Sequence, residues 1–78
     1  MSSLLSLLEV EPGQTCTVER TACRDAALAL RLQALGLTPG AVLVFLRQSP
    51  MGDLLAFTFR GTFIALGREA AACIHVRL

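Results

Sequence analysis

The stretch RLQALGLTPG, residues 31–40, compresses the end of a helix, a glycine stop and a Pro-Gly turn into ten residues. We predict the helix over residues 26–35, which are almost all strong helix formers. Leu28, Leu32 and Leu35 recur at the spacing of one helical face. They therefore predict a leucine stripe that faces a core.

The two ends of this helix carry their own signals. Asp25 is a good N-cap, because its carboxylate can accept hydrogen bonds from the first free amides of the helix. Gly36 lies where a left-handed residue ends a helix, and Leu37 is placed to pack back on the last turn. Pro39 and Gly40 then predict a tight turn. The stretch thus predicts a short, capped helix that is followed directly by a strand.

On both sides of the helix the pattern is that of short strands. Residues 14–20 alternate apolar and polar side chains, and further strands are predicted at residues 41–47, 54–60, 63–66 and 73–77. Ser6 and Glu9 have the spacing of a capping box, which predicts a single helical turn. The glycines that we expect to be structural turn residues are Gly13, Gly36, Gly40, Gly52 and Gly61.

About five strands, with one helix between the first two, predict a mainly β fold. The expected architecture is a small, closed or partly closed β-barrel with the leucine stripe of the helix capping an open end. Because a chain of 78 residues has no room for a second core, we expect residues 1–78 to form a single domain.

The cysteines and the N-terminal segment bear on location. Three cysteines are an odd number without paired spacing, so no disulfide framework is expected. The start of the chain lacks a basic residue before its apolar stretch and so does not read as a secretory signal. Arginines interrupt every long apolar run before it reaches the ~20 residues that span a bilayer. These features predict a cytoplasmic, reduced protein that does not insert into the membrane.

Charge and hydrophobicity point toward a protein partner. The formal net charge is +1 and the seven basic residues are spread singly, which argues against nucleic acid as a ligand. Hydrophobic residues make up 54% of the chain and charged residues only 17%, against roughly 25% charged residues in a typical soluble domain. A domain this small cannot bury so large an apolar set, so apolar surface is left for an interaction.

The sequence offers little for catalysis or metal binding. Cys73 and His75 could supply half of a metal site, but no further ligand lies in the same segment. The favoured interpretation is that both are surface residues without a ligand role. Cys16 is expected in the core and Cys23 in an exposed connection. No nucleophile, base and carboxylate are placed to orient one another. We therefore predict a protein that is not an enzyme and needs no cofactor.

Residues 31–40 resemble the RLxxLGLxPG signature of the FeoA family, small cytoplasmic proteins of bacterial ferrous iron uptake. The resemblance extends to LEVEPG, to SPMGDLLAFTFRG and to residues 63–76, and so covers nearly the whole chain from Leu4. It implies an SH3-like barrel and a partner, the membrane GTPase transporter FeoB, whose cytoplasmic region the protein would contact. Weaker versions of the signature occur in SH3-like domains of iron-dependent repressors; a 78-residue chain without a helix-turn-helix segment favours FeoA.

The partner surface is predicted from strand alternation and loop position. The family pattern implies that Leu43 and Phe45 point inward, which leaves their strand neighbours facing out. The predicted contact residues are Val42, Val44, Met51 and Phe63, with Leu37 and Pro39 of the Pro-Gly turn as the next candidates. Two alternatives stay open: a metal-binding regulatory module that uses Cys73 and His75, and an SH3-like domain that associates with itself, for instance as a weak homo-oligomer.

Overall fold

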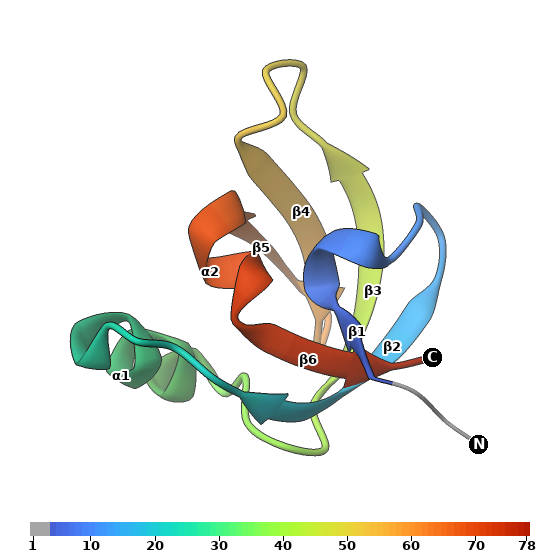
Figure 1. Ribbon diagram of the computed structural model, residues 1–78. Helices are drawn as coiled ribbons and strands as arrows, with labels where there is room; N and C mark the ends of the chain where they lie inside the picture. The colour runs from blue at the N-terminus through green and yellow to red at the C-terminus, as the bar shows by residue number, and fades with distance from the viewer. Residues whose placement is uncertain (1–3) are drawn as a thin grey trace.

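Residues 4–78 are described by the computed structural model, in which one antiparallel sheet curls around an apolar core (Figure 1). The six strands are β1 (Leu5–Ser6), β2 (Thr15–Thr21), β3 (Val42–Gln48), β4 (Leu54–Phe59), β5 (Thr62–Gly67) and β6 (Ile74–Arg77). The helical elements are the 3-10 turn η1 (Leu7–Glu9), α1 (Ala26–Leu35) and α2 (Arg68–Ala72). The predicted mainly β barrel with a helix between its first two long strands is confirmed.

The strand order is β1-β6-β2-β3-β4-β5, so β1 and β5 are the edges of the sheet. Two register shifts interrupt the ladders, one between Val18 and Arg20 on β2 and one between Phe45 and Arg47 on β3. Such bulges bend a strand and increase its twist. They let a single sheet wrap far enough to enclose a core.

The predicted helix matches α1 at both ends. Asp25 Oδ1 accepts hydrogen bonds from the amides of Ala27 at 2.9 Å and Leu28 at 3.4 Å. At the other end Gly36 has a φ of +93°, its amide donates to the Gln33 carbonyl, and the Leu37 amide donates to the Leu32 carbonyl. These two bonds form a Schellman motif, which requires a left-handed residue at the position of the glycine.

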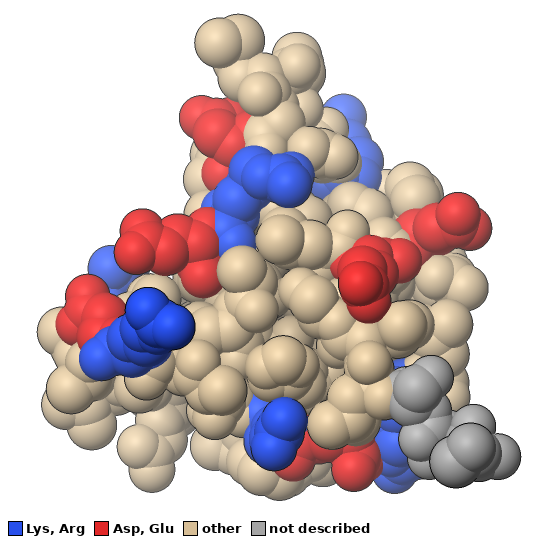
Figure 2. Space-filling model, viewed as in Figure 1, with Lys and Arg blue, Asp and Glu red and all other residues tan. Residues whose placement is uncertain are grey.

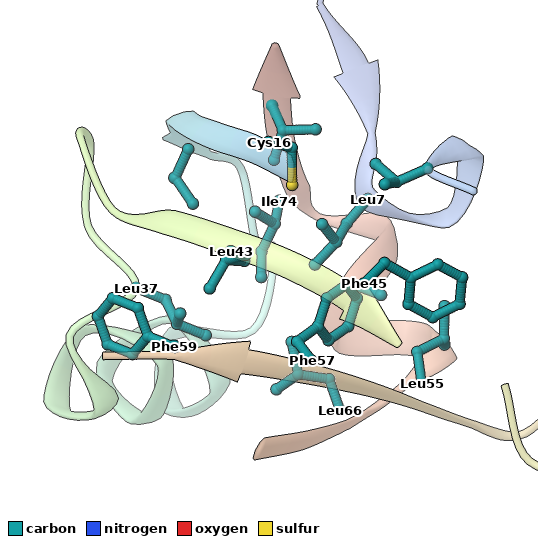
Figure 3. Packing of buried hydrophobic residues seen from close by; sticks show 14 of the residues in the cluster. Leu7, Cys16, Leu37, Leu43, Phe45, Leu55, Phe57, Phe59, Leu66 and Ile74 are labelled. Atoms are coloured by element: carbon teal, nitrogen blue, oxygen red, sulfur yellow. The ribbon is translucent and has the colours of Figure 1, made fainter. Parts of the chain in front are cut away.

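The predicted role of the leucine stripe is only partly correct. Leu32 is buried and Leu28 is partly buried, but Leu35 is 50% exposed. Figure 1 shows why: α1 stands out from the side of the barrel and meets it mainly near its C-terminal end. Leu37, which is 1% exposed and lies beside Phe59 in Figure 3, fills the core where the stripe was expected to do so.

The core is built from the inward-facing residues of the strands. Phe45 and Phe57, on neighbouring strands, have ring centroids 5.1 Å apart with the ring planes tilted by 39°. Leu43, Leu55 and other apolar side chains surround them (Figure 3). Burying each large apolar side chain stabilises the fold by roughly 1.5–3 kcal/mol. Among residues 4–78 no polar or charged residue is buried, so the core contributes packing and no chemistry.

The smaller elements follow the sequence signals closely. Both hydrogen bonds of the predicted capping box are present at η1, from the Leu8 amide to Ser6 Oγ and from the Ser6 amide to Glu9 Oε2. All five glycines expected at turns have a positive φ: Gly13, Gly36, Gly40, Gly52 and Gly61. Arg60 also has a positive φ, of 53°, so Arg60 and Gly61 form the type I′ pair of the β4–β5 hairpin.

The expectation of no disulfide is wrong. Cys23 and Cys73, which are 50 residues apart in the chain, form a disulfide with their Cα atoms 5.1 Å apart. The connection after β2 lies against the junction of α2 and β6, where the Ala22 amide also donates to the Cys73 carbonyl at 2.7 Å. These segments are distant in the sequence and come together only in the folded chain. The third cysteine, Cys16, is buried in the core, as expected.

Candidate functional site

The outward face of the sheet carries the predicted contact residues of β3 and β5. On β3, Leu43 and Phe45 are buried, while Val42 is 51% exposed and Val44 is half-buried. On β5, Leu66 is buried and Phe63 is 76% exposed. Because successive side chains of a strand point to opposite faces, Val42, Val44 and Phe63 all point away from the core.

Strand register brings two of these residues into one row. Val44 of β3 pairs with Thr58 of β4, and Thr58 pairs with Phe63 of β5. Residues directly opposite each other in antiparallel strands have side chains in contact range. Val44, Thr58 and Phe63 therefore form a continuous strip, which Thr15 extends onto β2 as the partner of Val44 on its other side.

A second row lies beside the first along the same strands. Arg47, Ala56 and Ala65 pair across β3, β4 and β5. Leu54, which is partly exposed, lies two residues before Ala56 on β4 and points to the same face. An open cavity of about 420 Å³ is lined by this row and by the end of β3. We call the apolar residues and the threonine of this face the outer patch; its members are Val42, Val44, Leu54, Ala56, Thr58, Phe63 and Ala65.

Pro39 borders the outer patch at the end near Val42. These two residues, with Gly40, Phe59 and Arg60, line a shallow hollow of about 590 Å³. The guanidinium of Arg60 lies 5.1 Å from the centroid of the Phe59 ring, a cation–π distance. The predicted turn residue Pro39 is thus contiguous with the predicted strand residue Val42.

Met51 is displayed separately. It is 87% exposed at the tip of the β3–β4 loop, which projects from the barrel in Figure 1. Hydrogen bonds hold this loop, including Ser49 Oγ to Asp53 Oδ1 at 2.7 Å and Gly52 amide to Ser49 carbonyl at 2.8 Å. Phe63 lies on β5 opposite Thr58, at the end of β4 that is farther from this loop. The structure therefore does not bring Met51 and Phe63 together.

Leu37 does not belong to this surface. It was predicted as a contact residue next to Pro39, but it is a core residue. Leu54, Ala56, Thr58 and Ala65 were missed, although the alternation of β4 and β5 carries the signal for all four. Leu55 and Phe57 face inward, so the residues between and beside them must face outward.

The candidate metal ligands are arranged differently from the expectation. Cys73 is the C-cap of α2 rather than a strand residue, and its sulfur is bonded to Cys23. His75 is half-buried on β6 between the buried Ile74 and Val76. Residues 4–78 contain no group of three or more His, Cys, Asp or Glu side chains that could hold a metal ion.

Electrostatics on the face shown in Figure 2 are mixed. Arginine and acidic side chains lie singly or beside one another, without a basic stripe. Arg77 and Glu19 form an exposed ion pair that joins β6 to β2. Burial raises the pKa of the Cys16 thiol, which keeps that side chain neutral in the core.

Comparisons with known proteins identify the family. The model for the FeoA domain matches residues 5–78. The solution structure of a FeoA protein from Chlorobium tepidum is 32% identical, covers 95% of this chain and 70% of its own, and superposes with a TM-score of 0.86. A crystal structure described as an iron uptake regulatory protein (FeoA) is 29% identical, with coverage of 96% and 97% and a TM-score of 0.82.

The same fold occurs in larger proteins. A manganese-dependent transcriptional repressor in complex with manganese has a TM-score of 0.88 at 23% identity, with 96% of this chain aligned to 37% of the repressor. At that identity the likeness concerns the SH3-like fold alone.

No curated protein matches the chain in sequence. No helix within residues 4–78 has the length and apolarity needed to cross a bilayer. The family match over residues 5–78 shows that the chain belongs to the FeoA family.

Proposed function

We propose that this chain is a cytoplasmic accessory protein of ferrous iron uptake, and that it docks through the outer patch on the cytoplasmic region of the membrane GTPase transporter FeoB. The observation that carries the proposal is the strip formed by Val44, Thr58 and Phe63, with Val42 beside it. Exposed apolar surface of this kind, with polar residues at its margin, is typical of a protein contact site.

The composition of the outer patch supports a protein contact rather than an ionic one. Its members carry no charge, and Arg47, in the row of Ala56 and Ala65, is the nearest basic side chain along the strands. Aromatic residues and arginine are enriched at protein interfaces, where a buried aromatic anchor supplies much of the binding energy. Phe63 is the natural anchor of the patch, because it is an aromatic residue and is more exposed than Val42 and Leu54, the other large exposed side chains of the patch.

The protein is proposed to act by binding and not by catalysis. Within residues 4–78 the core holds no polar side chain, and no cluster of metal-ligating groups lies at the surface. A nucleophile activated by a base and an orienting carboxylate would need such groups close together. The family membership supports the same conclusion, because it links the chain to iron transport through a small domain.

The experiment is a pull-down of the cytoplasmic region of FeoB with the full chain, with and without ferrous iron. Specific retention of FeoB in at least one of the two conditions is the expected result. No retention in either condition contradicts docking. Size-exclusion chromatography of the chain alone serves as the control for self-association: dimers that compete with FeoB would instead favour the self-associating reading.

A further inference from the structure

The Cys23–Cys73 bond lies where α1 is attached to the barrel. Cys23 belongs to the connection between β2 and α1, and Cys73 lies between α2 and β6. Over residues 22–27, Cys23 is the only residue that is not exposed. The next anchored side chain is Leu28, which is partly buried. The disulfide, with Leu28 beside it, is therefore the side-chain attachment at the N-terminal end of the helix.

The second attachment of α1 is at its other end. Leu32 and Leu37 are buried there, and the ring of Phe59 lies against Gly36. Between the two attachments the helix is largely exposed, with Leu30 65% and Leu35 50% exposed. Without the disulfide, the connection before the helix keeps the hydrogen bond from the Ala22 amide to the Cys73 carbonyl, while the C-terminal attachment is untouched.

The disulfide is also accessible. Both cysteines are half-buried, and both line an open cavity of about 300 Å³ together with Arg24, Leu28 and Glu69. A thiolate can therefore approach a sulfur atom without unfolding the barrel. The Sγ of Cys73 lies 3.2 Å from the Ala70 carbonyl oxygen. In the disulfide this sulfur has no hydrogen, but a reduced Cys73 thiol can donate to that oxygen, so both states are accommodated.

From these observations we infer that Cys23 and Cys73 form a thiol–disulfide exchange site whose substrate is a dithiol, and that reduction releases the N-terminal half of α1 from the barrel. The first thiolate of the dithiol attacks one cysteine sulfur, forms a mixed disulfide and displaces the other cysteine as a thiolate. The second thiol then displaces the first cysteine. Two electrons and two protons pass to the cysteines, and the dithiol becomes a disulfide.

The cell compartment supports a bond that forms and breaks. Disulfides of cytoplasmic proteins are usually transient or redox-sensing, so the cytoplasmic location proposed above favours a reversible bond over a permanent one. Reversal requires a small-molecule disulfide as oxidant, which returns to thiols as Cys23 and Cys73 are rejoined. The released element is a helix with exposed leucines, so its mobility changes the surface that the protein offers to a partner.

The experiment follows the cysteines and the helix together in the full chain. The folded protein is oxidised with oxidised glutathione, then treated with dithiothreitol, and each state is alkylated and mapped by peptide mass spectrometry. We expect one linked pair, Cys23 with Cys73, in the oxidised state. After reduction these two should alkylate in the folded protein while Cys16, which is buried in the core, should not.

Hydrogen–deuterium exchange measures the release of the helix in the same samples. Reduction should accelerate amide exchange several-fold in residues 26–31 of α1 and leave β3 and β4 unchanged. Cys16→Ala should show the same redox response, and the double variant Cys23→Ser with Cys73→Ser should exchange like the reduced protein in either buffer. The inference is overturned by a pair that does not link on oxidation, by a bond that dithiothreitol cannot reduce in the folded protein, or by exchange in α1 that ignores the redox state.

Discussion

At the scale of single residues, Gly36 joins the end of α1 to the core. Its φ of +93° lies in the left-handed region, and a Cβ built on it would lie 3.2 Å from the Phe59 ring. Gly40 has nearly the same φ, +96°, but a Cβ there would have no heavy atom within 4 Å. The two glycines therefore separate the cost of backbone strain from the cost of a close contact.

Gly40→Ala should lower the free energy of unfolding by about 1–2 kcal/mol, since a side chain is strained at this φ. Gly36→Ala should cost more than Gly40→Ala, because the Phe59 ring must also move. Urea denaturation of both variants measures the difference. Equal losses would mean that Phe59 yields freely, and no loss at either position would contradict the left-handed conformation.

Cys16 makes a second residue-scale prediction, concerning pH. Burial raises the pKa of its thiol above the ordinary value of ~8.5, so the folded chain keeps a proton that the unfolded chain loses. Because the unfolded state then binds fewer protons, stability falls as pH rises above that ordinary value. The chain has no lysine and no tyrosine, and Cys23 and Cys73 are bonded to each other, so no other side chain has an ordinary pKa close to that of the Cys16 thiol.

Chemical denaturation of the oxidised protein between about pH 8 and pH 10 tests this. The free energy of unfolding should decrease with a slope of up to about 1.4 kcal/mol per pH unit once the thiol of the unfolded chain ionises. Cys16→Ala should remove the slope while lowering the stability by a constant amount. A slope that survives this substitution would assign the pH dependence to another group.

At the scale of elements, the sequence predicts the two ends of α1 correctly but does not predict how the helix packs on the barrel. Its ends are set by Asp25 and Gly36, whose hydrogen bonds join residues close in the chain and can therefore be predicted from the sequence. Its packing was misjudged, because periodicity shows which leucines share a face but not how much of that face the barrel covers. Leu37 covers that part of the core, and a stripe of three leucines cannot reveal it.

The strands show the same division between local and distant information. Alternation predicted each long strand to within one residue at either end, and it predicted the outward position of Val42, Val44 and Phe63. It could not predict that Val44 and Phe63 share a row through Thr58, because register depends on turn geometry and bulges. The pairing of Cys23 with Cys73 was missed for the same reason: it depends on contacts between distant segments.

The disulfide also carries a stability prediction at this scale. It closes a loop of 50 residues, for which the chain-entropy relation gives a stabilisation of about 4 kcal/mol, with typical measured values of about 2–4 kcal/mol. Reduction should lower the melting temperature of the chain by about 10 °C or more. Differential scanning calorimetry of the oxidised and reduced protein measures this. The double variant Cys23→Ser with Cys73→Ser should melt like the reduced protein in both buffers, and an equal melting temperature in all samples would contradict the prediction.

At the scale of the whole molecule, the chain is an SH3-like barrel with an apolar core, an exposed helix and an outer patch whose members carry no charge. Metal binding by the oxidised monomer is expected to be absent or weak, because Cys73 is bonded to Cys23 and residues 4–78 bring no three ligands together. Isothermal titration calorimetry with Zn²⁺, and with Fe²⁺ under anaerobic conditions, should detect no site of micromolar affinity. A tight site that is lost on His75→Ala would instead support the metal-binding alternative.

The most direct test of the docking proposal is the affinity of the cytoplasmic region of FeoB for charged variants of the outer patch. Phe63→Glu and Val44→Glu should each weaken binding by about 30-fold or more, since truncating or charging an interface anchor costs ~2 kcal/mol or more. Their melting temperatures should stay within about 4 °C of the parent, as for surface substitutions. Leu30→Glu on α1, at a side chain that is 65% exposed, is the matched control and should bind like the parent. Full affinity of both patch variants, or loss of binding only in Leu30→Glu, would contradict docking through the outer patch.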